Sequence, residues 1–585
     1  MPHFLRRSCA ITSGQTRYRA FLLALLFVTL AACSGSGSQS QGANSDPNTE
    51  VSPRPTIGEL AADQVLRVHS FGQLKNFDPA KLGATTAGAG ALGRQYTEPL
   101  LLPRPGTAPP YRTDGAAAEK FEASPDGLTY TFYLRANGKY NDGQPVKAAD
   151  FVYAWRRLID PRQAAPFGPQ FARVVKGGQA AASLGPEADA TAVDASLDQL
   201  GLGAPDDRTF VVTLAQPLGY FEWIATLAQG APVRKDVVDR FGQDTWATKV
   251  DSLITNGPFK VSDIGSDTTT FVPNPNYWGP VKLQKLVAYY GLDPSARWTK
   301  YLNGEIDISN GPPAASTDAV LADPTFTKEL LKFPELSNNW LEFNTKKPPF
   351  DNPKVRLAFA QAIDREAYLK VATNPMAHAL TSLIPEGIAG YQGAQGGAQQ
   401  FDPAKAQAAL AAAGVTPEQI GTVDILTFAF QERDAVFIKD QLEKNLGVSA
   451  NVTSLSDGGA VTSRVKEGNF TLKTTFLGHA ANYPDPQDFF DVLLSSSPDN
   501  RTGWSNPDYD RLVTQADTTV DPAARQKLYD QAQSLLVEQA PVAFLAQPLR
   551  NYFLKPWVQG ITRTAVDSAW MPGDLYSKTL VIGKH

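Results

Sequence analysis

Cysteine is almost absent from this chain. The only two cysteines, Cys9 and Cys33, lie within the first 33 of its 585 residues. The part that follows can therefore form neither a structural disulfide nor a thiolate metal site. Histidine is also scarce: the five histidines are widely scattered and form no His-Glu-x-x-His pair. We therefore expect no metal centre and no cofactor.

The familiar motifs of catalysis are missing as well. The sequence has no G-x-S-x-G nucleophile elbow and no Walker A loop. Gly88–Gly93 (GAGALG) fits the dinucleotide pattern G-x-G-x-x-G, but the stretch before it, Asn76–Ala87, is polar and contains a proline instead of forming a buried strand. We expect a small-residue helix or turn there. Asp485 and Asp488 have a spacing that is common among 59 acids, so we expect solvated or capping roles for them. The sequence thus favours a binding protein over an enzyme.

Basic charge is not in excess. The formal net charge is -5, and four arginines lie in the first 32 residues, which contain no acid. The remaining chain is therefore more negative still. A nucleic-acid partner requires a basic face, so we expect no nucleic acid to bind.

The N-terminus has the pattern of an export signal. Residues 1–19 are basic, and Ala20–Ala32 (AFLLALLFVTLAA) is almost wholly apolar. Thirteen helical residues extend about 20 Å, which is too short for a bilayer core of about 30 Å. A basic head and a short apolar run ending in small residues predict a secretory signal peptide over residues 1–32.

Cys33 ends a segment, Leu30-Ala31-Ala32-Cys33, that resembles the bacterial lipobox, in which the cysteine is lipidated. Residues 33–56 are rich in Gly, Ser, Asn, Gln and Pro, which predicts a flexible tether. We expect an extracytoplasmic protein of the cell envelope, periplasmic where the host has a periplasm, attached to the membrane through a lipid on Cys33 only. The alternative is a plainly exported protein with an incidental cysteine.

The rest of the chain mixes strand and helix patterns. Leu128–Leu134 and Asn338–Asn344 have the aromatic and β-branched content of strands. Val355–Lys370 and Pro522–Val537 have helical spacing, the second with Asp521 as N-cap and Pro541 as a stop. Interleaved elements of this kind predict an α/β protein.

Several segments in this region resemble the family 5 extracellular solute-binding proteins, which are the oligopeptide, dipeptide and nickel binders of ABC importers. They occur in family order and extend to the C-terminal end, which resembles the oligopeptide-binding branch. The matching segments are Thr129–Asp160 with its Asp142-Gly143 turn, Thr255–Phe259 (TNGPF), Asn274–Trp278 (NPNYW), Pro348–Arg365, Asn500–Asp510, Glu538–Ala543 and Lys555–Val558 (KPWV).

The resemblance implies a type II periplasmic-binding-protein fold, with two lobes, three domains and a hinged cleft between the lobes. It implies a first domain from residues 57–95, 215–335 and 545–585, a small domain at 96–214, and a second lobe at 336–544. It also implies a peptide bound in the cleft through its main chain, with its side chains in roomy wet pockets.

The expected ligand site departs from the family pattern. The aspartate that meets the ligand's α-ammonium group in oligopeptide binders corresponds to Asn482, which is followed by Tyr483. The family tyrosine beside the ligand's N-terminus corresponds to Phe167, and an acidic pocket residue corresponds to Gly83. Asparagine accepts a hydrogen bond but carries no charge. We therefore expect a blocked, modified or differently oriented peptide, or another peptide-like molecule.

Two alternatives concern nearby residues. In a shifted alignment, Asp485 takes the role of the ammonium-binding aspartate. His479 and Lys473 lie close enough in sequence to meet a polar group of the ligand, although surface positions are the expected alternative for both.

The resemblance implies a monomeric substrate-binding protein that captures oligopeptides or peptide-like solutes and delivers them to an ABC permease and its ATPase. A sensor or chaperone built on the same fold is the main alternative, and an envelope hydrolase a remote one. A nickel or metal-chelate ligand occurs within the family, but a cysteine-free, histidine-poor body does not favour direct metal ligation.

Overall fold

The computed structural model describes residues 58–70, 72–83, 88–372, 377–393, 397–475 and 478–585. The predicted signal peptide, Cys33 and the tether lie outside these residues. Within the described part, no helix has the length and apolar character needed to cross a membrane.

The largest sheet has thirteen strands and contains both parallel and antiparallel pairs. Its central path runs in the order β16-β15-β17-β13-β19-β11-β1-β10-β9-β8, while β12 and β14 pair with β19 and β18 pairs with β13. The strands are β1 (Val65–His69), β8 (Phe259–Ile264), β9 (Thr268–Pro273), β10 (Lys285–Tyr289), β11 (Ile308–Ser309), β12 (Leu330–Pro334), β13 (Ser337–Phe343), β14 (Ala377–Ala379), β15 (Val423–Phe428), β16 (Ala450–Leu455), β17 (Leu472–Thr474), β18 (His479–Ala480) and β19 (Val542–Leu554).

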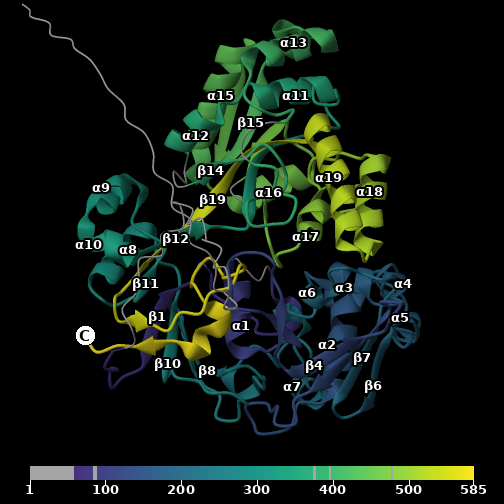
Figure 1. The fold of residues 1–585 in the computed structure, drawn as a ribbon, viewed down its shortest axis with the longest axis vertical. Helices are drawn as coiled ribbons and strands as arrows, with labels where there is room; N and C mark the ends of the chain where they lie inside the picture. Colours follow the sequence, from purple (N-terminus) through teal and green to yellow (C-terminus); the bar gives the residue numbers. More distant parts are fainter. Residues whose placement is uncertain (1–57, 71, 84–87, 373–376, 394–396, 476–477) are drawn as a thin grey trace, which may run out of the picture. The chain divides into compact units, whose positions relative to one another are not determined.

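Strand β19 joins the two halves of this sheet. Its first part pairs with β13 and β14, and its second part pairs with β12 and β11. Figure 1 shows β19 as a long yellow arrow that runs from β14 to β12. Nine of its thirteen residues are buried hydrophobics, which matches a strand covered on both faces.

A second, four-stranded antiparallel sheet has the order β4-β5-β7-β6. These strands are β4 (Ala118–Ala123), β5 (Thr129–Leu134), β6 (Leu202–Asp206) and β7 (Thr209–Thr213). In β5 every second side chain is buried, so the expected strand at 128–134 is confirmed. Helix α2 (Ala148–Ile159) buries Phe151, Trp155 and Leu158 at helical spacing and contacts β6 and β7 (Figure 1).

Two further short pairs complete the strands, β2 (Leu101–Pro103) with β3 (Thr113–Gly115) and β20 (Val558–Gln559) with β21 (Val581–Ile582). The helices other than α2 are α1 (Gly93–Tyr96), α3 (Gly168–Val174), α4 (Gly178–Ala182), α5 (Ala190–Leu197), α6 (Phe221–Ile224), α7 (Lys235–Phe241), α8 (Pro294–Leu302), α9 (Thr317–Ala322), α10 (Pro324–Glu329), α11 (Pro353–Gln361), α12 (Arg365–Val371), α13 (Pro403–Ala413), α14 (Pro417–Ile420), α15 (Glu432–Leu446), α16 (Gly458–Lys466), α17 (Pro486–Phe490), α18 (Pro507–Thr518) and α19 (Pro522–Gln539).

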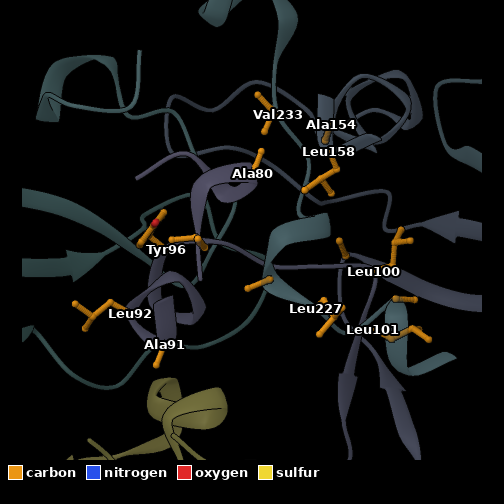
Figure 2. Close-up of a cluster of buried hydrophobic side chains, with 14 of the residues drawn as sticks. Ala80, Ala91, Leu92, Tyr96, Leu100, Leu101, Ala154, Leu158, Leu227 and Val233 are labelled. Carbon is orange, nitrogen blue, oxygen red and sulfur yellow. The ribbon is translucent and has the colours of Figure 1, made fainter. Parts of the chain in front are cut away.

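The largest hydrophobic core joins segments far apart in the sequence. Figure 2 shows part of it, with side chains from residues 80–101, from Ala154 and Leu158, and from Leu227 and Val233 in one cluster. Gly88–Leu92 forms a short 3-10 helix that leads into α1. The expectation of a small-residue helix at the G-x-G-x-x-G match is therefore confirmed.

Two of the other predicted elements agree with the structure and one does not. The strand expected at 338–344 is β13, and the second expected helix is α19, whose N-cap Asp521 accepts a hydrogen bond from the Ala524 amide. The prediction of a single helix at Val355–Lys370 is wrong. This segment is divided into α11 and α12, because Asp364 leaves helical geometry and caps a new helix by accepting a hydrogen bond from the Ala367 amide at 3.0 Å.

Candidate functional site

A polar cavity of about 750 Å³ lies between two segments that are far apart in the sequence. One segment contains α3 and the start of α4. The other contains β18, α17 and the 3-10 turn Asp491–Leu493. The lining residues are Pro166, Phe167, Pro169, Gln170, Arg173, Gln179, Gly478, His479, Ala480, Asn482, Asp488, Asp491, Val492, Ser496, Ser497, Pro498, Asp499 and Arg501. The predicted site residues Phe167, His479 and Asn482 are thus brought together.

Asp488 organises one wall of the polar cavity. Its carboxylate is 5% exposed, and its Oδ2 accepts a hydrogen bond from the Asn482 backbone amide at 2.7 Å. The same oxygen lies 3.0 Å from His479 Nε2, which donates when that nitrogen carries a proton. Asn482 Nδ2 donates to Asp488 Oδ1 at 3.3 Å. One carboxylate therefore fixes Asn482 and His479, two of the residues that the sequence predicted for this site.

The side-chain oxygen of Asn482 is a hydrogen-bond acceptor that no described residue uses. This Oδ1 atom is buried, and no group in the described ranges donates to it. Since the Nδ2 group points to Asp488, the oxygen is the part of the amide left for a ligand. A buried acceptor without a donor costs free energy, about 1–3 kcal/mol, that a donor on a bound molecule recovers.

The Asp485 carboxylate is paired with Arg525 and is not part of the polar cavity. Its carboxylate oxygens accept from Arg525 Nη1 at 2.9 Å and Nη2 at 2.7 Å, and Oδ1 also caps α17 through the Gln487 amide. Both side chains of this pair are largely buried. Asp485 does not line the polar cavity, so it faces α19 instead of the position that the shifted alignment gives it. The capping role expected for this residue is confirmed.

Tyr483 lies behind the cavity wall and is fully buried. Its hydroxyl donates to Gln487 and accepts from Gln170 Nε2 at 3.0 Å, and its ring stacks on Tyr220 with centroids 6.3 Å apart. The Gln170 contact ties α3 to the segment around α17, which Figure 1 also shows next to each other. Tyr483 therefore supports the wall and does not line it.

Gly83 is not at the polar cavity. Its carbonyl accepts a hydrogen bond from Gln229 Nε2 at 2.6 Å, and a β-carbon added to Gly83 would meet nothing within 4 Å. Phe167, by contrast, both lines the cavity and forms the N-terminal boundary of α3.

Sequence reasoning missed a charged pair that spans the two walls of the polar cavity. Arg173 of α3 pairs with Asp491, and its Nε and Nη2 atoms are buried without a partner among the described residues. Asp488 is only six residues from Asn482. A helix start predicted at Pro486 would have indicated that the two residues lie close together. Arg173 and Asp491 are 318 residues apart, and no local pattern in the sequence brings them together.

The described residues include no group of three or more His, Cys, Asp or Glu side chains arranged to hold a metal ion. The cavity instead offers hydrogen-bond donors, acceptors and one aromatic face. Such a lining suits reversible binding of a polar organic molecule.

The chain is similar to known binding proteins over most of its length. The periplasmic murein peptide-binding protein MppA of Escherichia coli (strain K12) is 32% identical over 477 residues, covering 79% of this chain and 84% of that protein. The periplasmic oligopeptide-binding protein OppA of Salmonella typhimurium is 29% identical over 550 residues, covering 91% and 95%.

A solved structure of the Escherichia coli murein tripeptide binding protein MppA has the same fold. It superposes with a TM-score of 0.74 at 28% identity, covering 90% of this chain and all of that one. The expected α/β fold of the periplasmic binding proteins is therefore confirmed. Residues 113–501 match the family described as bacterial extracellular solute-binding proteins, family 5 Middle. The resemblance found in the sequence is confirmed: the chain belongs to the family 5 bacterial extracellular solute-binding proteins.

Proposed function

We propose that this protein is the substrate-binding lipoprotein of an ABC transporter. It captures oligopeptides or peptide-like solutes outside the cytoplasm, is held to the membrane through Cys33, and delivers its ligand to the permease as a monomer. The family and the peptide-binding names of its relatives support this role. The absence of a nucleophile, base or metal motif from the sequence supports binding without catalysis.

The polar cavity is the proposed ligand site. The observation that carries this assignment is the buried, undonated Oδ1 of Asn482, a residue that lines the cavity and that the sequence resemblance matches to the ammonium-binding aspartate. Asn482 accepts a hydrogen bond from the ligand, His479 and Phe167 contact it, and Tyr483 and Asp485 hold the wall from behind. Gly83 stays outside this site.

The proposed ligand does not depend on a free α-ammonium group. A neutral acceptor contributes about 1 kcal/mol, against about 1.5–3 kcal/mol for a hydrogen bond to a charged group. Because Asn482 carries no charge that would pair with an ammonium group, a blocked or modified N-terminus, or a peptide in another orientation, also fits its acceptor. Asp488 is hydrogen-bonded to Asn482 and lies beside His479, but it also lines the polar cavity, so its charge acts on a bound ligand through space as well.

The proposed capture motion is a hinge closure of two lobes. The first lobe combines residues 57–95, 215–335 and 545–585 with the small domain 96–214, and the second is 336–544. The polar cavity draws its lining from the small domain and from the second lobe, as a cleft between lobes would. Closure would then bury a ligand between α3 and α17.

Native mass spectrometry of the protein, gently purified from a bacterial host and then denatured, tests this proposal. We expect released peptides or peptide-like molecules. A single blocked species supports the reading of Asn482, whereas a mixed ladder of free-N-terminus peptides supports peptide capture but contradicts that reading. Release of only metal ions or of molecules unrelated to peptides would contradict the proposed ligand class.

A further inference from the structure

A second cavity, of about 900 Å³, lies next to the polar cavity. We call it the basic cavity. It shares Pro498 and Arg501 with the polar cavity, so the two adjoin. Its lining residues are Asn344, Lys346, Lys347, Phe428, Val461, Thr462, Val465, Lys466, Glu467, Gly468, Phe470, Lys473, Thr475, Pro498, Asn500, Arg501, Thr502 and Gly503. All of them belong to the segment between residues 344 and 503.

A buried charge cluster forms the inner end of the basic cavity. Lys473 of β17 is 6% exposed, and its Nζ lies 3.1 Å from Glu342 Oε2 on the neighbouring strand β13. Arg501 donates from Nε to Glu342 Oε1 at 3.0 Å. The expectation that Lys473 occupies a surface position is therefore wrong, because pairing of β13 with β17 places it beside the buried Glu342.

This cluster holds two cations and one carboxylate. Burial raises the pKa of Glu342, but Lys473 and Arg501 outweigh that effect and hold it below its usual range. Burial lowers the pKa of Lys473, and Arg501 lowers it further, against the attraction of Glu342. The cluster therefore carries an excess positive charge, and a second anion would stabilise it.

Lys473 also has hydrogen-bonding capacity to spare. An ammonium group has three N–H donors, and Glu342 is its one hydrogen-bond partner among the described residues. Lys346, Lys347 and Lys466 are exposed at the same cavity, and within the described ranges none of them forms an ion pair. The basic cavity thus combines a buried donor with three lysines and one glutamate, Glu467, at its exposed part.

One part of the remaining wall of the basic cavity is apolar. Phe428, Val461, Val465 and Phe470 come from the end of β15, from α16 and from the loop before β17. These four residues belong to one small hydrophobic cluster or pack against it. An apolar wall facing a buried cation suits a molecule that carries a negative charge on an apolar body.

We infer that the basic cavity binds a carboxylate carried by an apolar body, with the carboxylate at Lys473 and Arg501 and the body against Phe428, Val461 and Phe470. This inference rests on the proposed function, in that the group would be part of the ligand whose other end lies in the polar cavity. The carboxylate is the C-terminus or an acidic side chain of a peptide, or that of a free organic acid.

Dansylglycine and dansylglycinamide test the inference, because they share an aromatic body and differ only in the carboxylate. Each is titrated by fluorescence against the full-length protein in lipid nanodiscs, with empty nanodiscs as the blank. We expect dansylglycine to bind at least about ten-fold more tightly than the amide.

Two variants locate the binding. Lys473→Met and Arg501→Gln each leave a balanced ion pair at Glu342, and each should reduce the preference for the acid to about two-fold or less. Lys285→Met is the matched control: Lys285 is exposed on β10, outside the cavity, and its loss should leave the preference unchanged. Arg501 is less buried than Lys473, so Arg501→Gln still provides the test if Lys473→Met does not fold.

Competition then identifies the source of the carboxylate. Displacement of dansylglycine by an N-acetylated peptide ending in phenylalanine, but not by its amide, assigns the site to a peptide terminus. Displacement by 4-phenylbutyrate alone assigns it to a free organic acid, and either result supports the inference.

Three results would overturn the inference: equal affinity for acid and amide, a preference that survives in both variants, or no binding of either probe. A failure of the proposed function can be distinguished from a failure of this inference. If dansylglycine binds as expected while no peptide-like ligand is ever recovered, binding in the basic cavity is supported and peptide capture is contradicted.

Discussion

In the proposed ligand site, Asn482 is the residue on which the ligand chemistry depends most. Its Nδ2 donates to Asp488, and its Oδ1 is buried with no donor among the described residues. The sequence resemblance matches this neutral side chain to a charged one in the oligopeptide binders, and we propose that it sets how strongly a free ammonium group is favoured.

Asn482→Asp should therefore increase the preference for free over N-acetylated peptides by about ten-fold, because a charged acceptor binds an ammonium group more strongly. Asp485→Ala should leave this preference unchanged and lower the melting temperature, because it removes the partner of Arg525. Isothermal titration with matched free and acetylated peptides measures both. Loss of binding in Asp485→Ala alone would contradict the role given to Asn482.

Asp517 gives a pH-dependent prediction. Burial raises its pKa to about 7, against the Tyr529 hydrogen bond at 2.7 Å and the charges of Arg173 and Arg525, while Asp491 raises it further. The unfolded value is about 3.9. Between these two values the folded state binds more protons than the unfolded state, so this group makes the protein less stable as pH rises.

Asp517→Asn should therefore stabilise the protein at pH 8 relative to pH 5, by about 3 kcal/mol if the whole pKa difference is expressed. The measurement is the difference in melting temperature between variant and wild type at the two pH values. An equal difference at both would contradict the raised pKa.

Predictions from the sequence were least complete at the scale of individual site residues. Asn482 and Phe167 were assigned to one site through resemblance, and His479 through its closeness in sequence; all three line one cavity. Arg173, Asp491 and the Lys473–Glu342–Arg501 cluster escaped notice, because these charges meet only through sheet pairing and long-range packing.

At the scale of single elements, strong local patterns were reliable. Aromatic and β-branched content predicted β5, and the Asp521 cap with helical spacing predicted α19. The break between α11 and α12 was missed, because apolar spacing continues through Ala362 and Ile363 while the chain leaves the helix. The cap signal of Asp364 was present in the sequence, but the periodicity outweighed it.

Replacing Asp364 tests whether this cap starts α12. Asp364→Ala should destabilise the protein by about 1 kcal/mol, because the Ala367 amide loses its acceptor. Asp364→Asn keeps an acceptor and should cost much less. The check is the melting temperature together with hydrogen exchange of the first turn of α12, and equal losses in the two variants would contradict the capping role.

At the scale of the whole molecule, β19 is the element that joins distant parts. It pairs with strands on both sides of residue 336, where the second lobe is proposed to begin. The proposed boundary at residues 544 and 545 lies within it. No local pattern could predict that one strand serves both halves of a thirteen-stranded sheet, since this follows from the order of strands along the chain and in space.

The central claim is that the protein captures peptide-like molecules in the polar cavity between α3 and α17. Hydrogen exchange of the full-length protein, with and without a mixed pool of short free and N-acetylated peptides, tests it most directly. The account predicts that the peptides protect residues 166–174 and 479–493 together. The exchange of α13, which lines neither cavity, should not change. Protection of neither segment, or of segments elsewhere only, would contradict it.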